Sequence, residues 1–507
     1  MTCSRGRSGL ALALGLALAP GEAAPPVRDV YEQSVVALTV TYQSWDEDRP
    51  WAKKRPGVRQ ASAVVVDGPR LLTTAQIVAD ATFLQADKFG RSTRTNPRVE
   101  FVDREIDLAL IAVDDPAFFA DLVAAPLAAR APSEGTLRTV RWRNQQLESA
   151  ASRVKRIVVE SSTFTSVEHP FLTVETDLDA GGWAEPVFLD GQLVGITVSQ
   201  NERRARVLPV EILARFLERA KDPASYRPFA VFGALWQLNT DPAVSAWLGQ
   251  VGEPRGILIR QVPWGSSGCG VLEPWDILLS IDGQPIDAEG FFAHPRYGQL
   301  RFPGIFVIDR TAGDVVPIQV LRGGASRDLQ MALRAYPAAQ ELIPARGGPG
   351  APPYRIAGGL VFRELDAEYL RTWGRDWASE APLRLLGRFN TEQHGQAPER
   401  RRIVLLKAVL PSEYTIGYHG LEDLPVETVN GIAVDSIEGL NRALERPVDG
   451  FQTIVLAPNG FRREIVLDAA GFEAATAEIL EEYGIPAAGR ASAPVPFDPG
   501  PPCPGHY

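Results

Sequence analysis

Short apolar runs rich in β-branched residues recur along residues 28–220 and alternate with turns. A hairpin turn at Leu189-Asp190-Gly191-Gln192 precedes the last of them, and residues 210–220 have helical periodicity that closes the unit. Many short strands at such spacing are typical of a barrel or sandwich. The clearest runs are residues 35–40, 63–66, 108–113 and 194–198.

Two further units follow, at residues 228–336 and 355–492. Each contains a strand-like run that ends in a turn, Ile281-Asp282-Gly283 in the first and Val429-Asn430-Gly431 in the second, which is a weak internal repeat. Residues 337–354 are rich in proline and glycine and are expected to be a linker. A proline-rich tail, residues 493–507, is expected to be disordered.

The amino-terminal segment has the pattern of a secretory signal, assigned to residues 1–23. Arg5 and Arg7 give a basic start, residues 10–19 are apolar, and small residues flank Glu22 at the expected cleavage site. The apolar run is too short for a permanent membrane anchor. We therefore expect a mature chain that begins near Ala24 and is periplasmic or secreted, with no integral membrane anchor.

Composition narrows the function further. A formal net charge of -10 over 507 residues argues against a nucleic-acid partner. The five histidines form no metal-site spacing, so we expect neither a metal nor a cofactor. The three cysteines are Cys3, Cys269 and Cys503, and a disulfide between the last two is compatible with an oxidising compartment.

Three short segments resemble the catalytic segments of trypsin-like serine proteases. Leu71 to Val78 resembles the strand and turn that carry the histidine base, but Gln76 stands at the histidine position. Gly181 to Pro186 resembles the nucleophile loop, with Trp183 at the serine position. Only the acid position, Asp107, keeps the expected residue type.

Over residues 28–492 the chain resembles the Do-like (HtrA) serine proteases. The resemblance implies a mostly β chain, a trypsin-like double β-barrel followed by two PDZ-like domains. The second unit resembles a PDZ domain through PWDILLSIDGQPI, residues 274–286. The third resembles the divergent second PDZ domain of the plant nuclear Deg-type branch. Its matching stretches are GGLVFRELDAEYL, IGYHGLEDLPVETVNG and GIPAAGRAS, and RPWAKKRP near the first strand also matches.

The degenerate triad, Gln76, Asp107 and Trp183, predicts an inactive protease homologue. A glutamine amide cannot cycle a proton near neutral pH, and an indole has no nucleophilic oxygen. The resemblance makes Gly181 and Gly182 the oxyanion loop, but two glycines that usually follow the nucleophile are replaced by Ala184 and Glu185. Residues 140–144 replace the Tyr-Pro-x-Gly turn that the family usually has there.

An active enzyme with a rearranged site remains an alternative. The only histidine in residues 28–220 is His169, which lies away from the base-carrying turn, so we expect it to be a satisfied surface residue. Asp107 without a histidine partner is then expected to be a hydrogen-bonded carboxylate at the end of a strand.

The resemblance to a PDZ domain makes Val231, Phe232, Gly233, Ala234 and Leu235 the peptide-binding loop. Such modules add a peptide strand to a sheet edge and hold its carboxylate on backbone N–H groups, and Gly233 would allow a close approach. The alternative is that Phe232, Leu235 and Trp236 belong to the core.

The expected partners are unfolded or C-terminal peptides of proteins, and the resemblance implies a trimer-based homo-oligomer. The expected role is in protein quality control or as a regulatory subunit. A structural assembly subunit is a further alternative.

Overall fold

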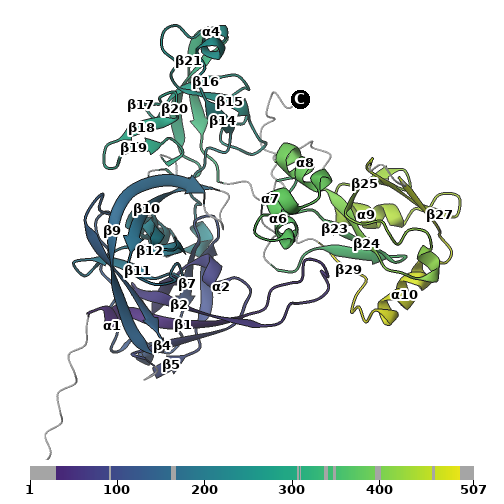
Figure 1. The fold of residues 1–507 in the computed structure, drawn as a ribbon, viewed down its shortest axis with the longest axis horizontal. Coiled ribbons are helices and arrows are strands. Elements are labelled where there is room, and N and C mark those ends of the chain that lie inside the picture. Colours follow the sequence, from purple (N-terminus) through teal and green to yellow (C-terminus); the bar gives the residue numbers. More distant parts are fainter. Residues whose placement is uncertain are drawn as a thin grey trace, which may run out of the picture.

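The computed structural model describes residues 30–90, 93–161, 167–304, 308, 310–335, 341–345, 350–393, 401–458 and 463–491. Strands dominate this part of the chain, which confirms the prediction of a mostly β protein. Figure 1 shows three β units, in purple to blue, teal and yellow-green. The predicted signal, residues 1–23, and the predicted tail, residues 493–507, lie outside the described residues.

The first unit begins with a seven-stranded antiparallel sheet in the order β5-β4-β1-β2-β3-β7-β6. Buried and half-buried residues alternate along most of β1, while the end of β2 is buried on both faces. The elements are α1 (Val30–Ser34), β1 (Val35–Tyr42), β2 (Gly57–Val66), β3 (Arg70–Thr73), α2 (Ala75–Val78), β4 (Ala81–Lys88), β5 (Thr93–Thr95), β6 (Arg98–Asp103), β7 (Leu108–Ala112) and η1 (Pro116–Phe119).

A closed barrel of six strands follows, in the order β10-β13-β12-β11-β8-β9. Helix α3 begins directly after β13, as the periodicity of residues 210–220 predicts, and it buries Ile212, Leu213 and Phe216. The elements are β8 (Thr136–Arg143), β9 (Gln146–Ser161), β10 (Glu168–Thr176), β11 (Pro186–Leu189), β12 (Gln192–Asn201), β13 (Arg204–Pro209), α3 (Val210–Arg219) and η2 (Pro223–Ser225).

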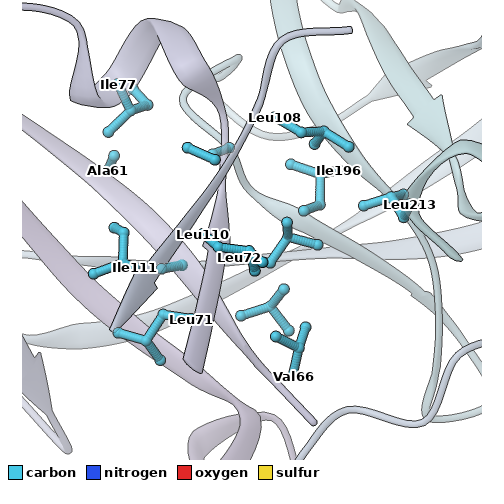
Figure 2. Close-up of a cluster of buried hydrophobic side chains, with 14 of the residues drawn as sticks. Ala61, Val66, Leu71, Leu72, Ile77, Leu108, Leu110, Ile111, Ile196 and Leu213 are labelled. Atoms are coloured by element: carbon cyan, nitrogen blue, oxygen red, sulfur yellow. The ribbon is translucent and has the colours of Figure 1, made fainter. Parts of the chain in front are cut away.

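One hydrophobic core joins this sheet to the barrel. Figure 2 shows Leu72 and Leu110 of the sheet together with Ile196 of the barrel and Leu213 of α3. All four side chains are at most 1% exposed. This packing fixes the position of α2 and of the turn before β7 relative to β12.

The second unit is a five-stranded path, β14-β15-β16-β20-β21, with β17 paired to β16 and a separate β18–β19 hairpin. Strand β14 lies at the edge of this sheet. The elements are β14 (Leu235–Leu238), α4 (Pro242–Trp247), β15 (Ile257–Gln261), β16 (Ile277–Ile281), β17 (Gln284–Pro285), β18 (Phe291–His294), β19 (Gly298–Arg301), β20 (Val315–Arg322) and β21 (Ala325–Ala332).

The third unit is built on the strand order β28-β27-β25-β24-β23-β22-β29, with β26 paired to β25. Its strands are β22 (Tyr354–Ala357), β23 (Leu360–Glu364), β24 (Val404–Val409), β25 (Leu424–Val429), β26 (Ile432–Ala433), β27 (Phe451–Leu456), β28 (Glu464–Asp468) and β29 (Gly489–Arg490). Its helices are α6 (Ala367–Leu370), η4 (Arg371–Trp373), α7 (Trp377–Glu380), α8 (Leu383–Glu392), η5 (Glu413–Thr415), α9 (Ile437–Leu444) and α10 (Phe472–Glu482).

The repeated motif seen in the sequence is a β-hairpin in both units. Asp282-Gly283 joins β16 to β17, and Asn430-Gly431 joins β25 to β26. All four residues have positive φ, between 51° and 76°. A two-residue turn with two positive φ values favours Asn-Gly and Asp-Gly, which explains why these dipeptides recur.

The loop between β1 and β2 reaches the third unit. The guanidinium of Arg363, on β23, donates to Glu47 Oε2 at 2.9 Å and also pairs with Asp366 at 3.3 Å. Arg490 Nη1 donates to Pro50 O at 3.0 Å. Because Arg363 is fully buried, this ion pair locks the third unit onto the first.

Candidate functional site

Gln76 and Asp107 meet at the seam between the sheet and the barrel. Gln76 lies in α2, directly after β3, and Asp107 lies in the turn before β7 with φ 55°. The backbone N–H of Gln76 donates to Asp107 Oδ1 at 2.8 Å, and its side-chain Nε2 donates to Asp107 Oδ2 at 3.2 Å. The same amide donates to Val198 O on β12 at 2.8 Å. Both residues are buried, so the amide satisfies a carboxylate that would otherwise lack this partner.

Trp183 lies in the loop between β10 and β11, and its side chain is 47% exposed. Its carbonyl oxygen accepts from the N–H of Ser62 at 3.2 Å, which ties the loop to β2. The loop is therefore held at the same seam as Gln76, because β12 bonds both. Gln76 bonds Val198, and Gln200 Oε1 accepts from Gly181 N at 3.0 Å.

Side chains of the protein occupy the backbone donors of the predicted oxyanion loop. Glu185 Oε2 accepts from Gly182 N at 2.8 Å and from Trp183 N at 3.0 Å. Thr197 Oγ1 also donates to this carboxylate and accepts from Glu185 N. Glu185 is only 2% exposed. The carboxylate thus lies where donors would be needed for a developing oxyanion.

Close packing explains the two glycines of this loop. Gly182 has φ +96°, and a Cβ there would lie 2.6 Å from the backbone N of Gln200. A Cβ at Gly181 would collide with the Gln200 amide oxygen. Ala184 has a positive φ of 64° and is completely buried, so this alanine adopts a conformation that favours glycine.

His169 is buried, at 1% exposure, so the expectation of a surface histidine was wrong. It lies on β10, and its Nε2 is 2.5 Å from the carbonyl oxygen of Glu105. Burial lowers the pKa of His169 to about 4. A histidine with so low a pKa is a weak base at neutral pH.

The predicted peptide-binding loop, residues 231–235, leads into edge strand β14, whose first residue is Leu235. Gly233 has φ +74°, and a Cβ there would lie 2.9 Å from Ser266 Cβ. Val231 O accepts from Ser267 Oγ at 2.5 Å, which fixes the loop against the turn that carries both serines.

The structure separates the two apolar side chains of this loop. Phe232 is 4% exposed and packs edge-on against Phe302, with ring centroids 4.9 Å apart, so it belongs to the core. Leu235 is 38% exposed. Trp236 also packs against Phe302 and is partly buried, so the alternative that all three residues are core is wrong for Leu235.

Sequence reasoning missed the roles of Glu185 and Gln200. The replacement of a glycine by Glu185 was a visible signal, whereas nothing around Gln200 indicated a contact with the loop. Among the described residues, no group of His, Cys, Asp and Glu side chains could hold a metal ion. None of the helices described is long and apolar enough to cross a membrane.

Comparison with known proteins finds similar proteins over most of the chain. A family model described as PDZ domain matches residues 343–491. The chain is 25% identical to "Protease Do-like 2, chloroplastic" of Arabidopsis thaliana over 479 residues, which is 92% of this chain and 76% of the relative. It is 22% identical to "Putative protease Do-like 13" of the same plant over 442 residues, covering 86% of this chain and 84% of the relative.

A shorter sequence match and a match to a solved structure are also to proteins named as proteases. The "Probable periplasmic serine endoprotease DegP-like" of Halomonas elongata is 27% identical over 215 residues, covering 39% of this chain and 40% of the relative. A solved structure, "HtrA-type protease AlgW with decapeptide", matches with a TM-score of 0.46 and 16% identity, over 61% of this chain and 98% of that one. The long alignments and the carboxy-terminal PDZ match make the chain similar to Do-like (HtrA) proteases over most of its length.

Proposed function

We propose that this protein is a catalytically inactive, exported Do-like protease homologue that binds peptide or protein C-termini. It acts in protein quality control or as a regulatory subunit. The observation that carries the proposal is the set of side chains and hydrogen bonds at the positions of the protease triad and its oxyanion loop. Gln76 replaces the base and bonds Asp107, Trp183 replaces the nucleophile, and Glu185 occupies the loop amides.

Hydrolysis is disfavoured at each step of the ordinary mechanism. Serine attack needs a hydroxyl and a titrating base, and residues 76 and 183 supply neither. In one measured protease, loss of the triad cost about 10⁶ in kcat, and the activity that remained came from the oxyanion hole and binding. Because Glu185 occupies two of these amides, we expect that residual activity to be lost as well.

The active-enzyme alternative requires a base other than Gln76. His169 is the histidine of the barrel that could serve, but its pKa of about 4 and its burial argue against this role. The Nε2 of His169 is hydrogen-bonded to the backbone carbonyl oxygen of Glu105. These contacts favour a structural role for His169.

Peptide binding is supported by the edge position of β14 and by the loop before it. An edge strand offers unpaired backbone groups to an extended peptide. Leu235, the first residue of that strand, is exposed and can contact an apolar side chain of the ligand. This observation favours a binding module over a purely structural assembly subunit, and a trimer-based homo-oligomer is compatible with either role.

Three measurements test the proposal. The purified protein should leave casein uncleaved and should not react with a fluorophosphonate probe, and serine-inhibitable cleavage would refute inactivity. A C-terminal peptide array should show binding, and the absence of any bound peptide would favour the assembly role. Mass spectrometry of the exported protein should find an amino terminus near Ala24; an intact terminus in the cytoplasm would refute export.

A further inference from the structure

Trp275 has a backbone conformation that residues other than glycine rarely adopt. Its φ is 75°, and its side chain is 46% exposed. A bulky residue in this left-handed region is strained, whereas glycine adopts it without steric cost. An exposed side chain also removes little apolar surface from water. Folding stability therefore does not account for a tryptophan at this position.

Buried hydrogen bonds hold the turn that carries Trp275. Asp276, which is 1% exposed, accepts from Arg322 Nε at 2.7 Å and from Arg322 Nη2 at 2.7 Å. Its carboxylate also accepts from Glu273 N at 2.9 Å, and Trp275 N donates to Ile259 O at 2.8 Å. A strained residue persists only where its surroundings fix it in this way, and such residues cluster at functional positions. The turn therefore holds the Trp275 indole at the surface.

Trp275 lies against a second exposed tryptophan. The Trp247 side chain, on α4, is 73% exposed, and its ring centroid lies 5.7 Å from that of Trp275 at an interplanar angle of 81°. The Arg260 guanidinium lies 4.6 Å from the centroid of the Trp275 ring. Two exposed indoles and a cation thus form one surface of the second unit.

Helix α4 exposes apolar residues where a surface helix usually exposes polar ones. Val244 and Leu248 pack against the sheet, and residues 242–252 include no charged side chain. Val251, in the turn after the helix, is 93% exposed. The exposed apolar residues of this segment are Pro242, Ala243, Ala246, Trp247 and Val251. Together with Trp275 they form what we call the α4 face, and an exposed apolar patch of this kind marks an interaction surface.

A lipid bilayer fits the α4 face better than a folded protein does. Figure 1 shows α4 at the outer end of the second unit, away from the first and third units, where a flat surface can reach it. The exposed parts of Trp247, Val251 and Trp275 amount to roughly 400 Å². A specific protein interface needs about 800 Å² from each partner. Tryptophan, in contrast, is enriched at membrane–water interfaces, because its ring is apolar and its N–H group is polar.

The charges around the α4 face indicate which kind of bilayer it contacts. Arg255 and Arg260 are exposed beside it, and so are Asp241 and Glu253. Two cations and two anions leave this rim without net charge. Binding is therefore expected to depend on buried apolar area rather than on anionic lipids, and to persist in salt.

We propose that the α4 face is an interfacial docking surface for a phospholipid bilayer. Trp247, Val251 and Trp275 enter the headgroup region, and the Arg260 guanidinium donates to a lipid phosphate. Because only residues 239–241 separate β14 from α4, docking holds the edge strand β14 close to the membrane. Neither the triad positions nor residues 231–235 belong to this surface, so docking is independent of the proposed function.

Vesicle flotation of the full-length chain tests the docking. The protein should float with phosphatidylcholine vesicles, and Trp247→Ala should lower the partition coefficient at least about tenfold, because it lacks an indole that leaves water on binding. Phe83→Ala is the matched control, since that side chain is 47% exposed in the first unit and its loss should leave flotation unchanged. A parent protein that stays unbound, or equal losses in the two variants, would overturn the proposal.

Trp275→Gly separates docking from a structural role. Glycine suits the φ of 75°, so this variant should unfold at the temperature of the parent or above it. It should nevertheless lose at least about tenfold in vesicle partition. Partition equal to that of the parent would overturn the proposal. If the variant is destabilised, Trp247→Ala decides, since little of that side chain is buried in the fold.

Salt, lipid composition and self-association distinguish the other occupants. Partition should change less than about threefold up to about 1 M salt, where the Debye length is about 3 Å. Release by salt, or a requirement for anionic lipid, would assign the attraction to charge and overturn the proposal. Sedimentation without lipid examines a second copy of the chain as the occupant. A dimer that Trp247→Ala dissociates, without vesicle binding by the parent, would also overturn the proposal.

Discussion

Glu185 should be the residue that keeps a repaired triad inactive. Gln76→His with Trp183→Ser restores the base and the nucleophile, and Asp107 is already placed to orient residue 76, since it accepts both the backbone and the side-chain N–H of Gln76. In this double variant Glu185 still accepts from the N–H groups of residues 182 and 183. We therefore expect cleavage far below that of ordinary proteases, whose kcat is about 1 s⁻¹ or more.

The size of the expected gain in activity follows from the two loop amides that Glu185 occupies. Removal of one oxyanion donor from a protease costs about 10²–10³ in kcat, or roughly 2.7–4 kcal/mol. Adding Glu185→Gly and Ala184→Gly to the double variant frees two amides and relaxes the positive φ at residue 184. We expect the quadruple variant to gain about 10²-fold or more in kcat/KM over the double variant.

A fluorogenic peptide assay and casein cleavage measure this gain. The matched control is Glu185→Gln on the double variant, because a glutamine oxygen can still accept from the loop amides and should leave activity low. Thermal unfolding of each variant checks that the fold persists, with an expected loss of about 1–3 kcal/mol for the removed hydrogen bonds. A double variant that already turns over at about 1 s⁻¹ would refute the reasoning.

Three other predictions concern stability and binding. Burial lowers the pKa of His169 in the folded protein to about 4, below its unfolded value of about 6.5. The stability that the buried neutral histidine contributes is therefore fully present above pH 6.5 and is lost as the pH falls toward 4. Between those limits the free energy of unfolding should fall by about 3 kcal/mol more in the parent than in His169→Gln, and equal pH profiles by chemical denaturation would contradict this. Arg363→Ala removes the guanidinium that pairs with Glu47 and Asp366, so it should cost about 3–5 kcal/mol of stability and loosen the junction with the third unit, which small-angle scattering and limited proteolysis would detect. Arg363→Ala with Glu47→Gln should cost less, and equal losses would argue against the ion pair. Gly233→Val should weaken C-terminal peptide binding by roughly 1–3 kcal/mol in calorimetry and also lower thermal stability, since its Cβ would press on Ser266; unchanged peptide affinity in folded protein would mean that the loop is misassigned.

The order of apolar and polar residues, together with turn dipeptides, predicted the strands and turns, because these elements depend mainly on residues that are close in the sequence. The β16–β17 turn follows from Asp282-Gly283, whose positive φ values suit this pair, and α3 follows from apolar periodicity. The contact between Gln200 and Gly181 was not predictable in this way, since it joins strand β12 to the loop between β10 and β11 through an uncharged side chain. The ion pair of Arg363 with Glu47 was equally hidden, because it links residues 316 positions apart.

The sequence also misjudged His169, for a physical reason. The position of His169 away from the base-carrying turn suggested a surface residue, but strand β10 is buried on both faces over most of its length. Tertiary packing of the barrel between β9 and β13 decides that burial. Burial in turn lowers the histidine pKa, so a residue that seemed a possible base is neutral at physiological pH.

The replaced residues complete the polar network around them, and this explains why the acid position could persist. A buried Asp107 without a partner would carry the full cost of a buried charge. Gln76 donates two hydrogen bonds to it and one to Val198, so the carboxylate keeps its role as an acceptor without a base. Glu185 does the same for the amides that a substrate oxyanion would otherwise satisfy. A site that lost only its catalytic side chains would keep unpaired donors and acceptors, whereas here Asp107 and the amides of Gly182 and Trp183 are paired within the protein. If the protein is inactive as proposed, these hydrogen bonds stabilise the seam without serving catalysis, and we expect that restoring activity requires replacing Glu185 as well as returning the histidine and serine.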